Sequence, residues 1–163
     1  MAARDRDASG RPQSARPRDA TGKPLPPGSA PSWRERLGHL DVEGSLPPQQ
    51  AIDAAAELIE TGQPFYAHEV LEGPWHLAEE PERHFWQGLA QVAVGLTHVQ
   101  RGNATGAATL LRRGAEKLTG YPDGHHGVAV ARLTTAAEEL AARIAVDGLE
   151  GLTPADLALR LRP

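Results

Sequence analysis

The sequence predicts an all-α fold, a small antiparallel helical bundle that follows an extended or disordered N-terminal arm. From residue 45 onward, apolar residues recur at helical spacing, and no segment shows the alternation that is typical of a strand. Gly, Pro and Asn mark short connections between the expected helices, which favours antiparallel neighbours. We therefore divide the chain into an arm, residues 1–44, and a helical bundle domain, residues 45–163.

The predicted helices of the first half of the domain are delimited by proline and glycine. Pro47-Pro48 opens a helix that ends near Gly62, and Pro64 opens the next one. Gly73-Pro74 predicts a kink or an end in this second helix, because proline lacks the N–H donor and crowds the preceding turn. Pro81 restarts the chain into a third helix.

The predicted third helix contains residues 85–100, a run without Asp, Glu, Lys or Arg. It is hydrophobic nearly all round, which is typical of a central helix. It stops at Arg101-Gly102, and Asn103 caps the next helix. After a turn at residues 121–124, the last long helix has an apolar face, and Thr153 begins a short terminal helix. The apolar face of the last long helix contains Leu133, Ala137, Leu140 and Ile144.

The composition restricts the chemistry and the location of the protein. The chain of 163 residues is long enough for one modest core. It has no cysteine, so a metal site must use histidine and carboxylate ligands. Its start is polar, and no apolar run approaches the ~20 residues of a membrane span. We expect a cytoplasmic protein with no membrane association.

The arm contains an internal repeat and an excess of positive charge. Residues 6–12, Arg-Asp-Ala-Ser-Gly-Arg-Pro, recur as residues 18–24, Arg-Asp-Ala-Thr-Gly-Lys-Pro. Asp followed three residues later by Gly is turn chemistry. Two interpretations stay open, an arm that docks on its own domain and a disordered tail. Six dispersed cations in residues 1–31 give no strong nucleic-acid signal.

The candidate functional site lies on the second and third predicted helices. His68 and Glu72 are one helical turn apart, whereas Gln87, Gln91 and His98 share one stripe of the uncharged helix. Burying a polar group without a hydrogen-bond partner costs about 1–3 kcal/mol, so we expect these side chains to contact one another. Aromatic side chains gather in the same region and predict a pocket for a small-molecule ligand. The predicted pocket residues are Phe65, Trp75, Trp86, Gln87 and Gln91.

Three interpretations of this site stay open. In the first, His68, Glu72 and His98 bind a divalent metal ion (Zn, Mn or Fe) and Glu69 is the catalytic general base of a hydrolase. In the second, the site binds a small polar or anionic molecule without metal. In the third, it is a buried structural network, and the protein is a non-catalytic scaffold or interaction module with a protein partner or a second copy of itself.

The remaining histidines and the acidic loop are interpreted as solvated. His125 and His126 are adjacent, and on a helix they would point to different sides. His76 and His84 flank a loop and are interpreted as exposed, with the alternative that either provides a third ligand if the loop folds over the pocket. Glu82 is a first-turn charge of the kind favoured at a helix N-terminus.

The motifs of the second to fourth helices closely resemble the bacterial domain of unknown function family 309. The resemblance covers residues 50–118. It implies a small all-α bundle, and because members are sometimes labelled predicted metal-dependent hydrolases, it also implies metal binding and hydrolysis. The motifs that carry it are Phe65–Glu72, Trp75, Gln87–Ala93, His98, Arg101–Asn103 and Gly106-Ala107.

Overall fold

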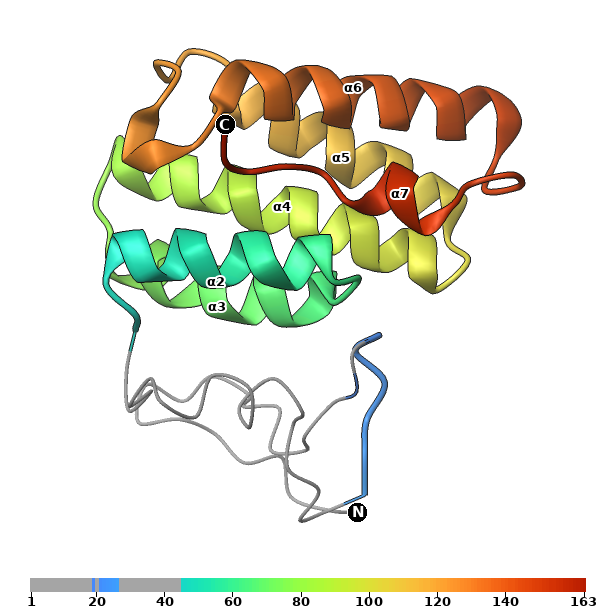
Figure 1. Cartoon of the computed structure of the whole chain (residues 1–163), viewed down its shortest axis with the longest axis horizontal. Coiled ribbons are helices and arrows are strands. Elements are labelled where there is room, and N and C mark those ends of the chain that lie inside the picture. The colour runs from blue at the N-terminus through green and yellow to red at the C-terminus, as the bar shows by residue number, and fades with distance from the viewer. Residues whose placement is uncertain (1–18, 20, 27–44) are drawn as a thin grey trace.

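The computed structural model describes residues 19, 21–26 and 45–163, and within these ranges every regular element is a helix (Figure 1). Successive long helices run in opposite directions, which confirms the predicted all-α bundle. The first copy of the repeat, residues 6–12, lies outside the described residues, as does most of the arm. The helices are α2 (Pro48–Glu60), α3 (Pro64–Leu77), α4 (Glu82–Gln100), α5 (Ala104–Leu118), the short η1 (His125–Gly127), α6 (Val130–Asp147) and α7 (Pro154–Leu157).

The ends of the helices follow local sequence chemistry. Pro48 and Pro64 occupy the first turns of α2 and α3, where a missing N–H costs nothing. The Asn103 side chain accepts a hydrogen bond from the Gly106 backbone N–H at 2.9 Å and so caps α5, as predicted. Thr153 begins α7 with a capping box.

Helix α3 departs from the sequence prediction at Gly73-Pro74. The predicted end is wrong, because α3 continues through Pro74 to Leu77. Pro74 has no N–H and so removes one helical hydrogen bond, while the Ala78 N–H still bonds the Pro74 carbonyl oxygen at 2.9 Å. Gly73 also permits close packing, since a Cβ there would lie 2.7 Å from Ser45 Oγ.

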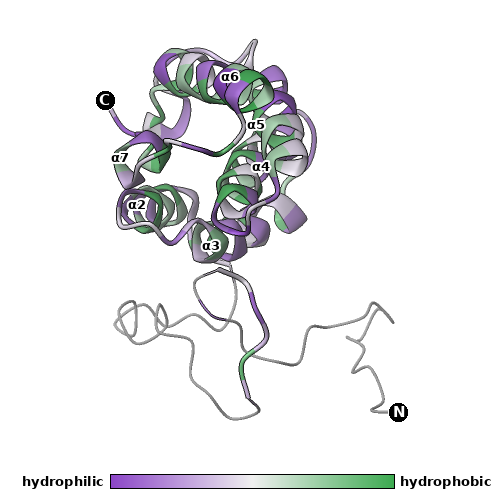
Figure 2. Cartoon of the chain, turned by 90° about the vertical axis from the view of Figure 1, so that its right-hand side faces the viewer, coloured by the Kyte–Doolittle hydropathy of each residue, from purple (hydrophilic) through white to green (hydrophobic). Residues whose placement is uncertain are grey.

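The core lies between the faces that α2 to α6 turn toward one another (Figure 2). Helix α4 packs between α3 and α5, and α5 packs between α4 and α6. As predicted for a central helix, α4 is buried along most of its circumference. The described helices include none that is both long and apolar enough to cross a membrane. The predicted apolar face of α6, Leu133, Ala137, Leu140 and Ile144, is buried.

The C-terminal segment closes the bundle on the side of α2. After α7 the chain runs back along the bundle (Figure 1). Leu161 is buried in the core, and its carbonyl oxygen accepts a hydrogen bond from the Ala129 N–H at 2.8 Å. Arg162 forms an ion pair with Asp53 of α2. These contacts connect the end of the chain to the first helix of the bundle.

Candidate functional site

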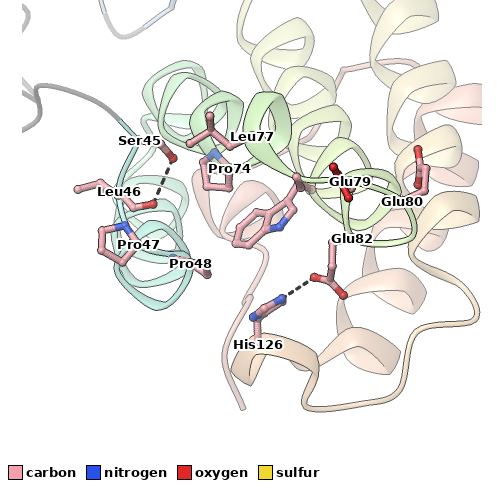
Figure 3. A pocket seen from close by; sticks show the side chains of 12 residues that line it. Ser45, Leu46, Pro47, Pro48, Pro74, Leu77, Glu79, Glu80, Glu82 and His126 are labelled. Carbon is pink, nitrogen blue, oxygen red and sulfur yellow. Dashed lines mark hydrogen bonds and ion pairs between the residues drawn. The ribbon is translucent and has the colours of Figure 1, made fainter.

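An open cleft of about 660 Å³ lies where α2 begins, α3 ends and α4 begins (Figure 3). Leu46 and two prolines form one wall, whereas Glu82 and His126 stand on the opposite side. Most of its exposed lining is apolar, with a few polar groups, which is the usual composition of a small-molecule site. The full lining is Ser45, Leu46, Pro47, Pro48, Pro74, Leu77, Ala78, Glu79, Glu80, Glu82, Trp86 and His126.

One carboxylate at the edge of the cleft binds two imidazoles. Glu82 Oε1 lies 2.9 Å from His125 Nε2, and Glu82 Oε2 lies 2.6 Å from His126 Nε2. The side chains of Glu82, His125 and His126 are 39%, 23% and 29% exposed, so each is shielded but reachable from solvent. One ligand atom from each residue lies within 4.8 Å of the others.

The backbone of η1 explains how two adjacent histidines reach the same carboxylate. His126 adopts a left-handed conformation with φ of 48°, and Gly124 before the turn has φ of 87°. Aromatic rings of α4 support both imidazoles, since the Phe85 centroid lies 4.7 Å from that of His125 and the Trp86 centroid lies 5.3 Å from that of His126. The rings are therefore held in place by packing as well as by Glu82.

The interpretation of His125 and His126 as solvated side chains is wrong. It assumed helical spacing, which would turn the two rings apart, whereas the left-handed residue in η1 brings them together. Glu82 lies in the first turn of α4, as predicted, but it also binds the two imidazoles. It lies 43 residues before His125, so no local pattern links the two side chains.

The charges around this cluster favour an ionised carboxylate. Burial alone would raise the pKa of Glu82, but hydrogen bonds and charge from His126 and His125 outweigh it and hold the pKa below its ordinary value. Nearby, the Tyr121 hydroxyl donates a hydrogen bond to the Pro81 carbonyl oxygen at 2.6 Å. Burial and the Glu80 and Glu82 carboxylates raise the pKa of Tyr121, so it stays a neutral donor.

These three residues fit a divalent cation. Two imidazole nitrogens and a carboxylate are a common ligand set for zinc and for Fe(II). Each imidazole has to present an unprotonated nitrogen, so binding would replace the present hydrogen bonds to Glu82 and release protons. Among the described residues, Glu82, His125 and His126 form the one group of three such ligands within this distance.

The predicted site on α3 contains one close pair. His68 Nε2 lies 3.2 Å from Glu72 Oε1, and the two side chains are 20% and 40% exposed. The hydrogen bond from His68 is the main cause that lowers the pKa of Glu72. The other ring nitrogen, His68 Nδ1, is buried and has no hydrogen-bond partner in the described part of the chain. Glu69, the predicted base, is half-buried on the same helix.

In the described residues, the ligand atoms of His98, His68 and Glu72 do not all lie within 4.8 Å of one another. His98 Nδ1 lies 3.0 Å from Nδ2 of Asn103, the capping residue of α5. Burial, with a smaller contribution from the Arg101 charge, lowers the pKa of His98. The roles assigned to these α3 and α4 residues stay predictions.

The predicted pocket residues occupy different places. Trp86 lines the cleft, whereas Gln87 and Gln91 line a shallow depression together with Arg113, Glu116 and Lys117 of α5. Gln91 Oε1 is buried and unpartnered in the described structure.

The other two predicted pocket residues lie near opposite ends of α3. Trp75 stacks on His76, with ring centroids 5.2 Å apart. Phe65, in the first turn of α3, packs against Gly22 of the arm. The aromatic residues therefore belong to several environments rather than to one pocket.

The comparison with protein families agrees with the resemblance in the sequence. Residues 52–110 match the model of a family described as Domain of unknown function (DUF309). The matched segment includes His68, Glu72 and Glu82 and ends before His125. No curated protein is significantly similar to the chain. Residues 52–110, from α2 into α5, therefore match the family of the domain of unknown function DUF309.

Proposed function

We propose that the protein binds a divalent metal ion through Glu82, His125 and His126 and hydrolyses a small molecule held in the adjoining cleft. One observation carries this proposal: a carboxylate and two imidazoles place ligand atoms within 4.8 Å of one another at the edge of the cleft. Two of the three residues, Glu82 and His126, line the cleft itself.

The number of ligands is the one found in catalytic metal sites rather than in structural ones. Catalytic zinc sites use three protein ligands and keep a position for water or substrate, whereas structural sites use four. A divalent cation in such a site polarises a carbonyl or phosphoryl oxygen and lowers the pKa of water. The partial exposure of all three side chains provides access for a ligand from solvent.

The cleft favours a substrate with an apolar body and one polar group. Trp86, Pro47 and Pro74 provide apolar surface, and the polar group of the substrate would reach Glu82 and His126. The Phe85 and Trp86 rings support the imidazoles, so little ordering of the two side chains is needed when a metal binds.

The second candidate is the predicted site at His68, Glu72 and His98, with Glu69 as base. It is supported by the contact of 3.2 Å between His68 and Glu72 and by the buried, unpartnered Nδ1 of His68. A histidine oriented by a carboxylate is also the arrangement of a general base, so this pair does not require a metal.

Metal content and metal titration distinguish the two sites. The full chain is purified without chelator, and zinc, manganese and iron are measured by elemental analysis and by calorimetric titration. His126→Ala removes a ligand of the cleft site, His68→Ala removes a ligand of the α3 site, and His84→Ala removes an exposed histidine as a matched control. We expect one metal ion per chain in wild type, His68→Ala and His84→Ala, and at least tenfold weaker binding in His126→Ala.

Two outcomes would overturn the proposal. If binding is lost in His68→Ala and kept in His126→Ala, the metal belongs to the α3 site. If wild type binds no metal, Glu82 and the two histidines are a structural network that ties η1 to α4, and a non-catalytic scaffold becomes the better interpretation. If the metal binds as proposed, turnover of ester and phosphoester substrates by wild type and not by His126→Ala tests the hydrolase activity.

A further inference from the structure

In the second copy of the repeat, residues 19 and 21–24 form a turn that is stabilised by hydrogen bonds among these residues. Asp19 Oδ1 accepts hydrogen bonds from the Thr21 N–H at 2.9 Å, the Thr21 hydroxyl at 2.8 Å and the Lys23 N–H at 2.9 Å. The Asp19 N–H also bonds the Lys23 carbonyl oxygen at 2.9 Å, and the Gly22 N–H bonds the Asp19 carbonyl oxygen at 2.9 Å. These hydrogen bonds form within the turn, so the turn does not depend on the bundle for them.

This turn docks on Phe65 of α3 and Arg101 at the end of α4, a pair that we name the turn receptor. Arg101 Nε donates a hydrogen bond to the Thr21 carbonyl oxygen at 2.6 Å, and its guanidinium carbon lies 5.9 Å from the centroid of the Phe65 ring. Gly22 is buried, and a Cβ there would lie 2.6 Å from Phe65 Cδ2 and would collide with the Arg101 guanidinium. Its φ of 77° also favours glycine.

Every feature that the docked turn uses recurs in the first copy. Asp7 corresponds to the carboxylate that closes the turn, Ser9 to the hydroxyl of Thr21, and Gly10 to the glycine at the close contact. Arg11 replaces Lys23, whose side chain is exposed and therefore does not select between the two. The first copy can thus make the contacts that the structure shows for the second.

We propose that the turn receptor is a peptide-binding site for an Asp-x-Ser/Thr-Gly-Lys/Arg-Pro turn, and that residues 7–12 of the same chain are its alternative occupant. Exchange of the two copies moves the arm by twelve residues, the period of the repeat, and releases residues 19–26 from the bundle. In this proposal either copy of the repeat occupies the turn receptor, one at a time.

The length of the intervening chain permits both registers. Residues 25–44 lie between the second copy and the domain, whereas residues 13–44 lie between the first copy and the domain. The chain that spans the distance for the second copy therefore also spans it for the first. Because the cost of closing a loop rises slowly with its length, the longer loop lowers the occupancy of the first copy by only about twofold if the contacts are equal.

Competition with an added peptide tests the proposal in the full chain. Gly22→Ala blocks the second copy, because a Cβ at Gly22 collides with the receptor. Gly10→Ala with Gly22→Ala should block both copies if the first copy docks in the same way. The probe is a synthetic peptide of residues 5–13, and its control is the same peptide with Gly10→Ala. Binding is measured by calorimetry and by the NMR signal of the Arg101 Nε–H group.

We expect the peptide to bind the double variant, and Phe65→Ala in that variant to abolish the binding. In Gly22→Ala the first copy should still compete, so the apparent affinity for the peptide should be weaker than in the double variant and within roughly threefold of wild type. Helix content by circular dichroism should be equal in wild type, Gly22→Ala and the double variant, because both glycine substitutions lie outside the bundle.

Three results would overturn the proposal. The first is equal binding of the peptide by Gly22→Ala and by the double variant, which would show that the first copy does not reach the receptor. The second is no binding of the peptide by the double variant. Finally, dimers that form in Gly22→Ala and dissociate on dilution would place the first copy on a neighbouring chain instead of on its own.

Discussion

At the scale of single residues, Glu82 connects α4 to η1 through one carboxylate. A glutamine in its place can accept a hydrogen bond only through its oxygen, while its amide group faces the second imidazole as a donor. We expect Glu82→Gln to lower the free energy of unfolding by about 1 kcal/mol, a small value because the side chain is 39% exposed.

Urea denaturation measures this effect, with Glu79→Gln as an exposed control that should change the free energy of unfolding by less than about 0.5 kcal/mol. Equal stability of the two variants would show that the contacts of Glu82 with His125 and His126 contribute nothing to the fold without metal.

The carboxylate of Asp156 makes the stability of the α7 cap depend on pH. Hydrogen bonds from the Thr153 backbone and side chain, and then from Arg143, lower the pKa of Asp156 to about 2. Because this pKa lies below the ordinary value of 3.8, the stabilisation of the α7 cap is complete above that value and is lost as the pH falls through about 2. NMR titration of the carboxyl carbon should give this midpoint.

The matched variant for this prediction is Asp156→Asn, which has no charge to lose. Its stability should depend less on pH than that of wild type in the acid range. A midpoint for Asp156 near its ordinary value of 3.8 would contradict the prediction.

At the scale of elements, glycines allow α4 and α5 to approach closely. A Cβ at Gly114 would lie 2.7 Å from Val92 Cγ2 and 2.9 Å from the Gly88 carbonyl oxygen. The second contact is with a backbone atom, so no side-chain rotation can relieve it. Gly114→Ala should therefore destabilise the protein by about 1–3 kcal/mol, although alanine is the better helix former.

Thermal or urea unfolding tests this packing, and Arg112→Ala, an exposed substitution on the same helix, is the control. An increase in stability for Gly114→Ala would mean that helix propensity outweighs the close contact, and that the two helices can move apart at little cost.

At the scale of the whole molecule, the C-terminal segment joins the last part of the chain to the first helix of the bundle. Leu161 is 1% exposed, so Leu161→Ala should cost about 2–5 kcal/mol, in the range of other buried leucines. Val146, which is 83% exposed on α6, provides the control, since Val146→Ala should change stability by less than about 0.5 kcal/mol. Urea denaturation of both variants measures the difference.

The predicted domain boundary lies between residues 44 and 45. We expect residues 45–163 to fold without the arm, because the core formed by the described residues starts at Leu46. Circular dichroism of this fragment should show the helix content of the bundle and cooperative unfolding. A fragment without cooperative unfolding would show that the arm is part of the folding unit.

Structural features that depend on neighbouring residues are the ones that the sequence predicts best. The start of α2 at Pro48, the cap of α5 at Asn103 and the Asp19 turn all follow from local hydrogen bonding and from the fixed φ of proline. At Pro74 the local sequence predicted a kink or an end, and the end is wrong, because the loss of one hydrogen bond does not by itself stop a helix that is packed in a bundle.

The candidate site depends instead on contacts between distant residues. The His68–Glu72 pair could be read from its spacing of one turn, since both residues belong to α3. The surroundings of Gln87 and Gln91 could not be predicted, because a polar stripe on a central helix can face either neighbouring helix, and here it lies beside α5.

The pattern of apolar residues was sufficient to establish an all-α bundle, because each helix must bury its own apolar face. Only the tertiary structure brought Glu82 to His125 and His126, since the contact requires both the packing of η1 against α4 and a left-handed residue within η1. Such a contact links residues that are far apart in the chain, and its geometry is set by the packing of the whole bundle rather than by the local sequence.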